Sequence, residues 1–124
     1  KFSIKYHIIF VCKYRKQLLA DRRVGEFMKS DMIRISKTSK FKIQEIEIDK
    51  DHIHLLIDSV PHISGAQIDR KLKQESTNSV WEQFSDLLKK QFWKERTFWS
   101  DGYFIATTGQ ASEETIRRYI ENQG

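Results

Sequence analysis

The sequence predicts an α+β domain in which one antiparallel sheet is covered on one face by helices. Stretches with apolar side chains at every second position, the period of a strand, alternate with stretches whose apolar side chains recur every three or four residues, the period of a helix. Their order is strand, helix, strand, strand, helix, strand and a closing helix. This order matches a ferredoxin-like, or RNA-recognition-like, α+β sandwich.

The first half of the chain contains two strands separated by a helix. Apolar residues alternate from Phe2 to Cys12 and the second face is partly apolar, so we expect a strand covered on one side and half covered on the other. Asp21 can cap a helix that runs to about residue 38. Its inner stripe would consist of Val24, Met28, Met32 and Ile35. The next strand, 41–49, shifts its apolar phase, which indicates either a bulge or a change of the face that is covered.

The second half begins with a hairpin turn at residues 50–51 and a central strand, His52–Ser59, which Pro61 ends. Ser64 can cap the following helix, and a second helical stretch is expected over Val80–Trp93. Strand segments at 98–99 and 103–107 are separated by a turn, and a last helix starts near Ser112.

Length and composition favour a single globular domain, residues 1–124. Of its 124 residues 39% are hydrophobic and 31% are charged, and two separate cores would each be marginally stable. The formal net charge of +5 comes from the first half, where residues 1–62 carry 13 basic and 8 acidic side chains. Such an excess permits an anionic partner. One cysteine, no signal peptide and no long apolar stretch predict a cytoplasmic protein without a membrane span.

Two histidines in the central strand form the first candidate site. His52 and His54 are two residues apart, so their side chains share one face, about 7 Å apart along the strand. Two neutral imidazoles at this spacing can bind one metal ion. The same pattern also occurs where strand histidines are merely solvated, so the pair alone does not establish a metal site.

The last helix carries the second candidate site. Tyr119 and Gln123 are one helical turn apart and lie on one face. A tyrosine hydroxyl can act as a covalent nucleophile, and a carboxamide oxygen can ligate a hard divalent ion; a half-buried boundary tyrosine is the alternative. Together with His52 and His54, these side chains suit one reaction, in which a metal-bound scissile phosphate is attacked by Tyr119.

Motifs spread over nearly the whole chain carry a family resemblance. They are YHIIFVCKYRKQLL at 6–19, HIHLLI at 52–57 followed by Pro61, W-x-x-GYF at 99–104, T-x-G at 107–109 and ETI-x-RYIENQ at 114–123. In this order they resemble the His-hydrophobic-His transposases with a single catalytic tyrosine, of the insertion-sequence 200/605 type.

The resemblance implies a homodimeric transposase that cleaves and rejoins single-stranded DNA at the hairpin-bearing ends of a mobile element, through a 5′-phosphotyrosine link. By this resemblance His52 and His54 bind a metal ion, Gln123 is its third ligand and Tyr119 is the nucleophile. The ion would be Mg²⁺, and the donor set also suits Mn²⁺. In this family the last helix is mobile and often docks on the partner's histidines, and Gly109 would be its hinge. The sequence leaves open whether Tyr119 acts in its own protomer or in the partner.

Basic side chains that could contact DNA phosphates occur in two clusters. One lies in the first half, and the other lies on a central helix, where a solvated helix face is the alternative. The candidates are Lys13, Arg15, Lys16, Arg22, Arg23, Arg70, Lys71 and Lys73.

Three other functions are compatible with the sequence. A non-catalytic module that binds single-stranded nucleic acid could use the same sheet, but here the central strand carries histidines in place of stacking aromatic residues. A metal-dependent phosphodiesterase would use water in place of Tyr119 as the nucleophile. A domesticated relative that processes repeated hairpins in its host genome would use the same chemistry.

Overall fold

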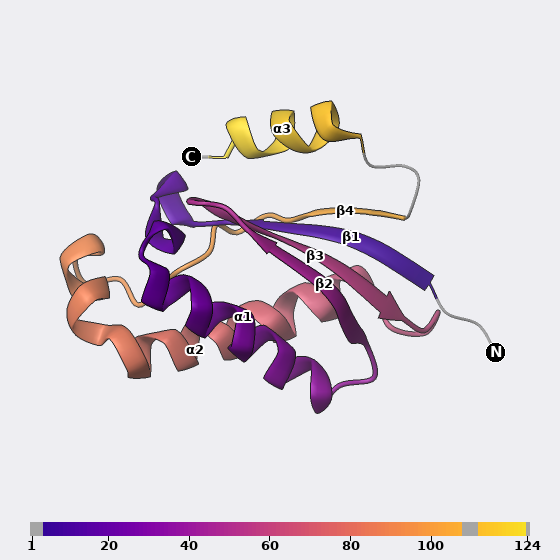
Figure 1. The fold of residues 1–124 in the computed structure, drawn as a ribbon, viewed down its shortest axis with the longest axis horizontal. Helices are drawn as coiled ribbons and strands as arrows, with labels where there is room; N and C mark the ends of the chain where they lie inside the picture. Colours follow the sequence, from indigo (N-terminus) through magenta and orange to yellow (C-terminus); the bar gives the residue numbers. More distant parts are fainter. Residues whose placement is uncertain (1–3, 108–111, 124) are drawn as a thin grey trace.

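A computed structural model describes residues 4–107 and 112–123 as a four-stranded antiparallel sheet with helices on both faces (Figure 1). The strand order is β2-β3-β1-β4, so β3 and β1 are central. This arrangement confirms the ferredoxin-like α+β fold class. The elements are β1 (Ile4–Val11), the 3-10 turns η1 (Lys13–Arg15) and η2 (Leu18–Ala20), α1 (Arg22–Lys37), β2 (Lys42–Ile48), β3 (His52–Ser59), α2 (Gly65–Gln91), β4 (Phe104–Thr107) and α3 (Glu113–Glu121).

The two faces of the sheet differ because side chains alternate along β1 and β3. Ile8 pairs with Leu55, and both belong to the core that packs against α1 and α2. The next pair, Ile9 with His54, therefore points to the opposite face. His52 lies two residues before His54 and shares that face. The strand predicted for the histidines is thus confirmed, with its two imidazoles on the side away from α1 and α2.

The helix α1 has the cap and the apolar stripe that the sequence predicts. Asp21 Oδ1 accepts a hydrogen bond from the backbone N–H of Arg23 at 2.9 Å, which satisfies a free donor at the helix start. The side chains of the inner stripe are fully buried: Val24, Met28, Met32 and Ile35. Burial of this stripe is what holds α1 on the sheet.

The helix α2 runs without a break through Val80 and kinks further on, at Phe84 (φ −128°, ψ 37°), so the prediction of a separate second helix that starts at Val80 is wrong. It begins at the expected cap, where Ser64 and Gln67 form a reciprocal capping box. The polar residues around Ser76 are helical, and the buried Ser76 hydroxyl accepts a hydrogen bond from Trp99 Nε1 at 3.0 Å, a tertiary contact that no local pattern reveals. Although α2 spans 27 residues, neither it nor another helix within the described ranges is apolar enough to cross a membrane.

The sheet is irregular at its two edges. In β2 the register shifts between Ile43 and Glu45, which confirms the predicted bulge. On the other edge, the segment predicted as a strand at 98–99 makes one isolated bridge, from Trp99 to Cys12, and β4 begins at Phe104. A loop therefore precedes β4.

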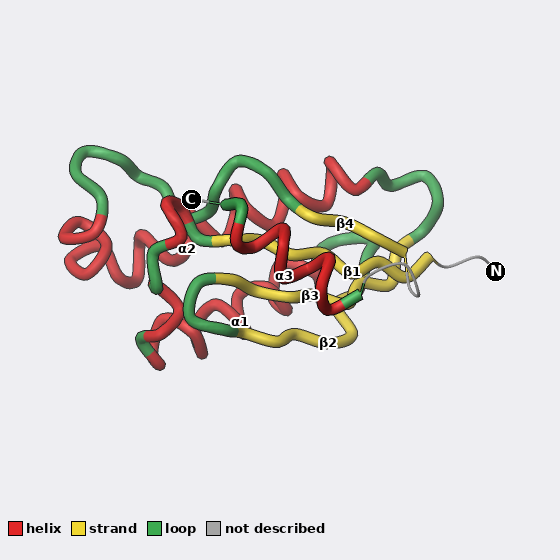
Figure 2. The backbone as a smooth tube through the Cα atoms, turned by 90° about the horizontal axis from the view of Figure 1, so that it is seen from above, coloured by secondary structure: helices red, strands yellow, loops and turns green. Residues whose placement is uncertain are grey.

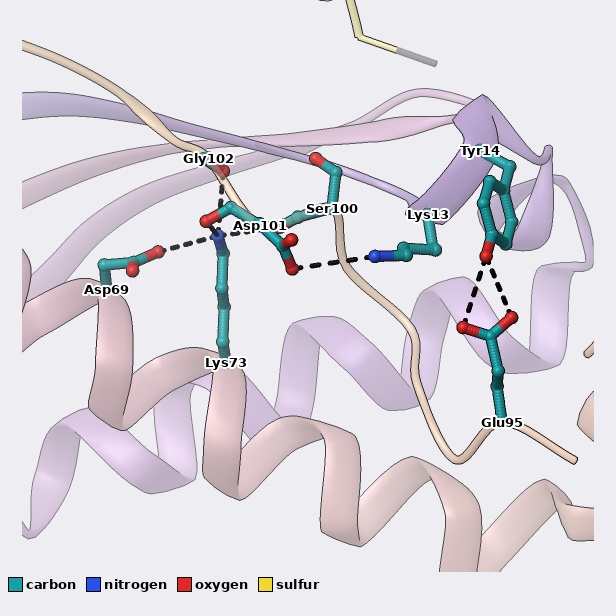
Figure 3. A network of polar contacts seen from close by, with 8 residues as sticks. All are labelled: Lys13, Tyr14, Asp69, Lys73, Glu95, Ser100, Asp101 and Gly102. Atoms are coloured by element: carbon teal, nitrogen blue, oxygen red, sulfur yellow. Dashed lines mark hydrogen bonds and ion pairs between the residues drawn. The ribbon is translucent and has the colours of Figure 1, made fainter.

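Lys73 of α2 fixes this loop (Figure 3). Its Nζ donates hydrogen bonds to the backbone carbonyls of Ser100, Asp101 and Gly102, at 2.9, 3.2 and 2.8 Å, and lies 2.9 Å from Asp69 Oδ1. These contacts fix the backbone of the loop before β4 against α2.

The helix α3 lies across the sheet face opposite α1 and α2 (Figure 1, Figure 2). Its Tyr119 ring packs against Phe104 of β4, with ring centroids 5.7 Å apart. Ile9 and Val11, which point to this face, are fully buried, so β1 is more covered here than the sequence indicated. In contrast, α3 itself has no fully buried residue. The face that carries the histidines is thus only partly open.

Candidate active site

His52 is held from one side by an acidic side chain. Its Nδ1 lies 3.0 Å from Asp51 Oδ1, and Arg15 Nε donates a hydrogen bond to Asp51 Oδ2 at 3.2 Å. The turns that carry Asp51 and Arg15 are adjacent because the backbone N–H of Cys12 donates to the Asp51 carbonyl. When a carboxylate accepts the Nδ1–H of an imidazole, the Nε2 lone pair is free for a ligand.

His54 is held by a third histidine. Its Nε2 lies 2.9 Å from Nδ1 of His7 on β1. Burial lowers the pKa of His54 below its usual value of 6.5, and the neighbouring His7 lowers this pKa further. His54 is therefore neutral near pH 7, which is the form in which imidazole binds a metal ion.

Two grooves meet at His52. One, of about 710 Å³, passes both histidines and reaches the first turns of α1; its other polar lining includes Arg22, Glu26, Lys29, Glu47 and Asp49. The second, of about 660 Å³, lies between α3 and the turn before β3; its charged lining consists of Arg15, Asp49, Asp51, Glu113, Glu114, Arg117 and Glu121. A ligand could therefore reach His52 through either groove.

The Tyr119 hydroxyl is buried and has no hydrogen-bond partner within the part of the chain that the structure describes. Burial raises the pKa of Tyr119 from 10.0 to about 12, with a further contribution from the Asp69 carboxylate. In this position the phenol is thus held in its protonated form. A tyrosine nucleophile must lose its proton as it attacks, so this position suits a resting residue better than a reacting one.

The structure brings the predicted site residues together in two pairs and keeps the pairs apart. A Cβ atom added to Gly102 would lie 3.5 Å from the Tyr119 hydroxyl and 4.0 Å from Gln123 Oε1, so both side chains meet beside Gly102. His52 and His54 lie on β3, which β1 separates from β4. Across residues 4–107 and 112–123, no hydrogen bond or ring contact joins Tyr119 or Gln123 to either histidine.

The donor chemistry fits a divalent ion, and the two histidines form part of a ligand set. His52 and His54 offer two imidazole nitrogens on one face. Among the residues described, no three histidine, cysteine, aspartate or glutamate side chains are placed to hold a metal ion. The third ligand, for which Gln123 is the prediction, would have to approach the histidines from elsewhere.

Several basic side chains predicted to contact DNA are engaged within the protein. Lys73 is directed at backbone carbonyls and not at solvent (Figure 3). Four others form ion pairs: Arg15 with Asp51, Arg23 with Asp21, Lys71 with Glu75, and Lys13 with Asp101. A phosphate contact by any of these would compete with an existing partner.

Three other candidates are differently placed. Arg22 lines the groove that also contains His52 and His54. Arg70 is exposed on α2, and the Lys16 ammonium lies 5.7 Å from the centre of the Phe92 ring. The predicted hinge, Gly109, lies outside the described residues.

Sequence reasoning missed His7, Asp51 and Asp69. Asp51 directly precedes His52, so its proximity could have been noticed. His7 is brought to His54 by the antiparallel pairing of β1 with β3, and Asp69 is brought toward Tyr119 by the packing of α2 and α3 around β4. These two relations depend on tertiary structure, for which the sequence contains no local signal.

Comparison with known proteins gives concordant matches. A family model described as "Transposase IS200 like" matches residues 1–123. The transposase for insertion sequence element IS200 of Salmonella typhimurium is 33% identical over 126 residues, covering 99% of this chain and 78% of that protein. The ISDra2 transposase TnpA of Deinococcus radiodurans is 27% identical over 122 residues, covering 98% and 85%.

Solved structures show the same relationship. A crystal structure of a candidate transposase from Deinococcus radiodurans superposes with a TM-score of 0.89 at 28% identity, covering 99% of this chain and 92% of that one. A REP-associated tyrosine transposase bound to a REP hairpin shares the fold, with a TM-score of 0.59 at 12% identity and coverages of 95% and 62%. The family resemblance of the sequence motifs is thereby confirmed: the chain belongs to the family of IS200-like transposases.

Proposed function

We propose that this transposase cleaves and rejoins single-stranded DNA by transesterification, with Tyr119 as the nucleophile. The phenolic oxygen of Tyr119 forms a bond to the scissile phosphorus, and the bond from phosphorus to the leaving 3′ oxygen breaks. The phenolic proton passes to solvent, and the leaving oxygen takes up a proton. The product is a 5′-phosphotyrosyl link, which retains the energy of the phosphodiester, so that a second 3′ hydroxyl can reverse the reaction without ATP.

The observation that carries this proposal is the placement of both candidate pairs on one side of the sheet. His52 and His54 point to the face that α3 crosses, and α3 brings Tyr119 and Gln123 to the same face. A buried hydroxyl without a hydrogen-bond partner is costly in a protein interior unless it serves a function. Both facts are expected when Tyr119 acts near the histidines.

A divalent ion would be held by His52, His54 and Gln123. When bound, such an ion makes the phosphorus a better electrophile and stabilises charge on the phosphate oxygens. Mg²⁺ is the proposed ion, and Mn²⁺ suits two imidazoles and an amide oxygen at least as well. The histidines would orient the phosphate, while Gln123 would keep its position relative to Tyr119 because the two are one turn apart on α3.

The active site would be shared in a homodimer. Within the described residues Tyr119 and Gln123 make no hydrogen bond or ring contact with the histidines of their own protomer, and a movement of α3 onto a second copy would bring the two pairs together. The segment that precedes α3 contains Gly109, the proposed hinge. A shared site explains how a Tyr119–Gln123 pair and a histidine pair can each be well formed and still lie apart.

The DNA substrate would be a single strand that carries a hairpin at the end of a mobile element. The proposal rests on the family to which the chain belongs and on the hairpin bound by a structural neighbour with the same fold. Arg22 and Lys29 line the same groove as the histidines and could meet a phosphate that approaches them; of the two, Arg22 is a predicted DNA contact.

Replacement of Tyr119 by Phe tests the chemistry. With a labelled single-stranded oligonucleotide that contains the hairpin and cleavage site, the wild-type protein should give a covalent adduct on a denaturing gel, and Tyr119→Phe should give none while it still shifts the hairpin in a native gel. Tyr14→Phe is the matched control, because Tyr14 is exposed and bound to Glu95. An adduct in the Tyr119→Phe variant would refute the assignment, and cleavage without an adduct would indicate a hydrolase.

A further inference from the structure

His7 is a histidine of β1 for which the proposed reaction has no use. It lies on the sheet face of His52 and His54, because β1 pairs with β3 so that Ile9 is opposite His54 and His7 is two residues further along. The His7 and His54 rings are 5.1 Å apart between centroids and inclined at 53°. Their closest nitrogens, His7 Nδ1 and His54 Nε2, are 2.9 Å apart, which is hydrogen-bond distance.

A hydrogen bond between two neutral imidazoles requires one nitrogen to carry the proton. If His54 Nε2–H donates to His7 Nδ1, both rings have their proton on Nε2, which is the tautomer that free histidine prefers. The reverse direction would place the protons of both rings on Nδ1, the less favourable position. Glu47 Oε1 lies 3.7 Å from His54 Nδ1, too far for the hydrogen bond that could compensate. We therefore expect His54 to be the donor.

This arrangement decides which His54 nitrogen can meet a ligand. With Nε2 bound to His7, the lone pair lies on Nδ1, on the side of Glu47. Glu47, His52 and His54 all line the same groove. For His52 the assignment is reversed, because Asp51 occupies Nδ1 and leaves Nε2 free. Each histidine of the pair thus has one nitrogen fixed by a neighbour and one available.

We propose that His7 is a positioning residue for the metal site: it accepts the Nε2–H of His54 and so orients the Nδ1 lone pair toward the groove shared with His52. This inference rests on the proposed role of His52 and His54 as metal ligands. His7 would thus fix one nitrogen of His54, as Asp51 fixes one nitrogen of His52. Partners of this kind typically change metal affinity by about 10- to 100-fold when they are removed.

The first test concerns the metal-free protein and needs no DNA. In ¹H–¹⁵N NMR spectra of the imidazole rings, wild-type His54 should show its proton on Nε2, with slow exchange against solvent. His7→Phe keeps a flat ring but cannot accept, so this signal should broaden or disappear; His7→Asn, whose amide oxygen can accept, should retain it. A wild-type His54 protonated on Nδ1, or an equally protected Nε2–H in His7→Phe, would overturn the proposal.

The second test measures the dissociation constant for Mn²⁺ alone, by calorimetry, without substrate. His7→Phe should weaken binding by about 10- to 100-fold, and His7→Asn should restore most of it. His62→Phe is the control, because His62 is exposed beyond the end of β3 and should leave the affinity unchanged. Unchanged or tighter binding in His7→Phe would refute the positioning role. Neither the NMR spectra nor the Mn²⁺ titration depends on formation of the Tyr119 adduct. The proposal for His7 can therefore be refuted independently of the proposed transesterification.

Discussion

His52 and His54 are each proposed as a metal ligand, so each can be tested by its own substitution. Replacement of either by Ala should abolish cleavage of single-stranded DNA, because each would remove a proposed metal ligand. Hairpin binding in the presence of EDTA should persist, since neither imidazole is needed for backbone contacts. Gel assays of cleavage and of binding on the same oligonucleotide measure both effects. Cleavage that survives both substitutions would place the metal site elsewhere.

The raised pKa of Tyr119 predicts how the free energy of unfolding changes at alkaline pH. Its pKa is raised from 10.0 to about 12 by burial and then by Asp69. A raised folded-state pKa means that the buried neutral phenol contributes stability below about pH 10, and that this contribution is lost as the pH rises toward about 12. The free energy of unfolding of Tyr119→Phe should therefore fall less over this range than that of the wild type. Urea titrations followed by tryptophan fluorescence would measure it; equal losses would contradict the pKa shift.

Cys12 should be chemically inert in the folded protein. It is fully buried, and burial raises the pKa of its thiol far above the usual value, so almost no thiolate is available to react. A thiol reagent at pH 8 should label the native protein at the rate of global unfolding and the urea-unfolded protein at once. Rapid labelling without denaturant would show that the end of β1 opens locally.

Residue spacing determined what could be predicted about the site. His52 with His54, and Tyr119 with Gln123, each lie within one element, where the periods of strand and helix decide which side chains are neighbours. The partner His7 belongs to another strand and depends on register. For the same reason the sequence could not show that Tyr119 lies beside Gly102.

At the level of elements, Lys73 connects α2 to the loop before β4. Replacement by Met would leave several backbone carbonyls and Asp69 without their cation, at a cost of about 2 kcal/mol in the free energy of unfolding. Lys71→Met, on the same helix, removes a more exposed pair with Glu75 and should cost less than about 0.5 kcal/mol. Chemical denaturation of both variants tests the comparison. Equal effects would mean that Lys73 does not stabilise the loop.

The elements themselves were predictable wherever one face is apolar. The cap and stripe of α1, the bulge of β2 and the limits of β3 all follow from local patterns. The prediction failed for α2, which continues through the polar residues around Ser76, whose hydroxyl accepts a hydrogen bond from Trp99. It also failed for residues 98–99, which make one isolated bridge to Cys12 in place of a strand.

For the whole molecule, the net charge of +5 should appear as salt-dependent DNA binding. The dissociation constant of a hairpin oligonucleotide should rise steeply between about 50 and 200 mM salt, because phosphate contacts release counterions. Arg22→Ala should reduce the slope of log Kd against log salt concentration by about one, the amount expected for one lost phosphate contact. Lys73→Ala should hardly change this slope, since the Lys73 ammonium is bound to the protein. Fluorescence anisotropy titrations measure the slopes, and a flat response would contradict a basic binding surface.

The polar attachment of α3 to the sheet is slight. The hydrogen bond that Arg15 of η1 donates to the Glu121 carbonyl is long, at 3.4 Å, and no residue of α3 is fully buried. Hydrogen exchange should therefore divide the molecule into two cooperative units, with slow amides in β1 and β3 and fast amides in α3. A protein can in this way keep a rigid histidine strand at full stability while the helix that carries the proposed nucleophile detaches from the sheet at little free-energy cost.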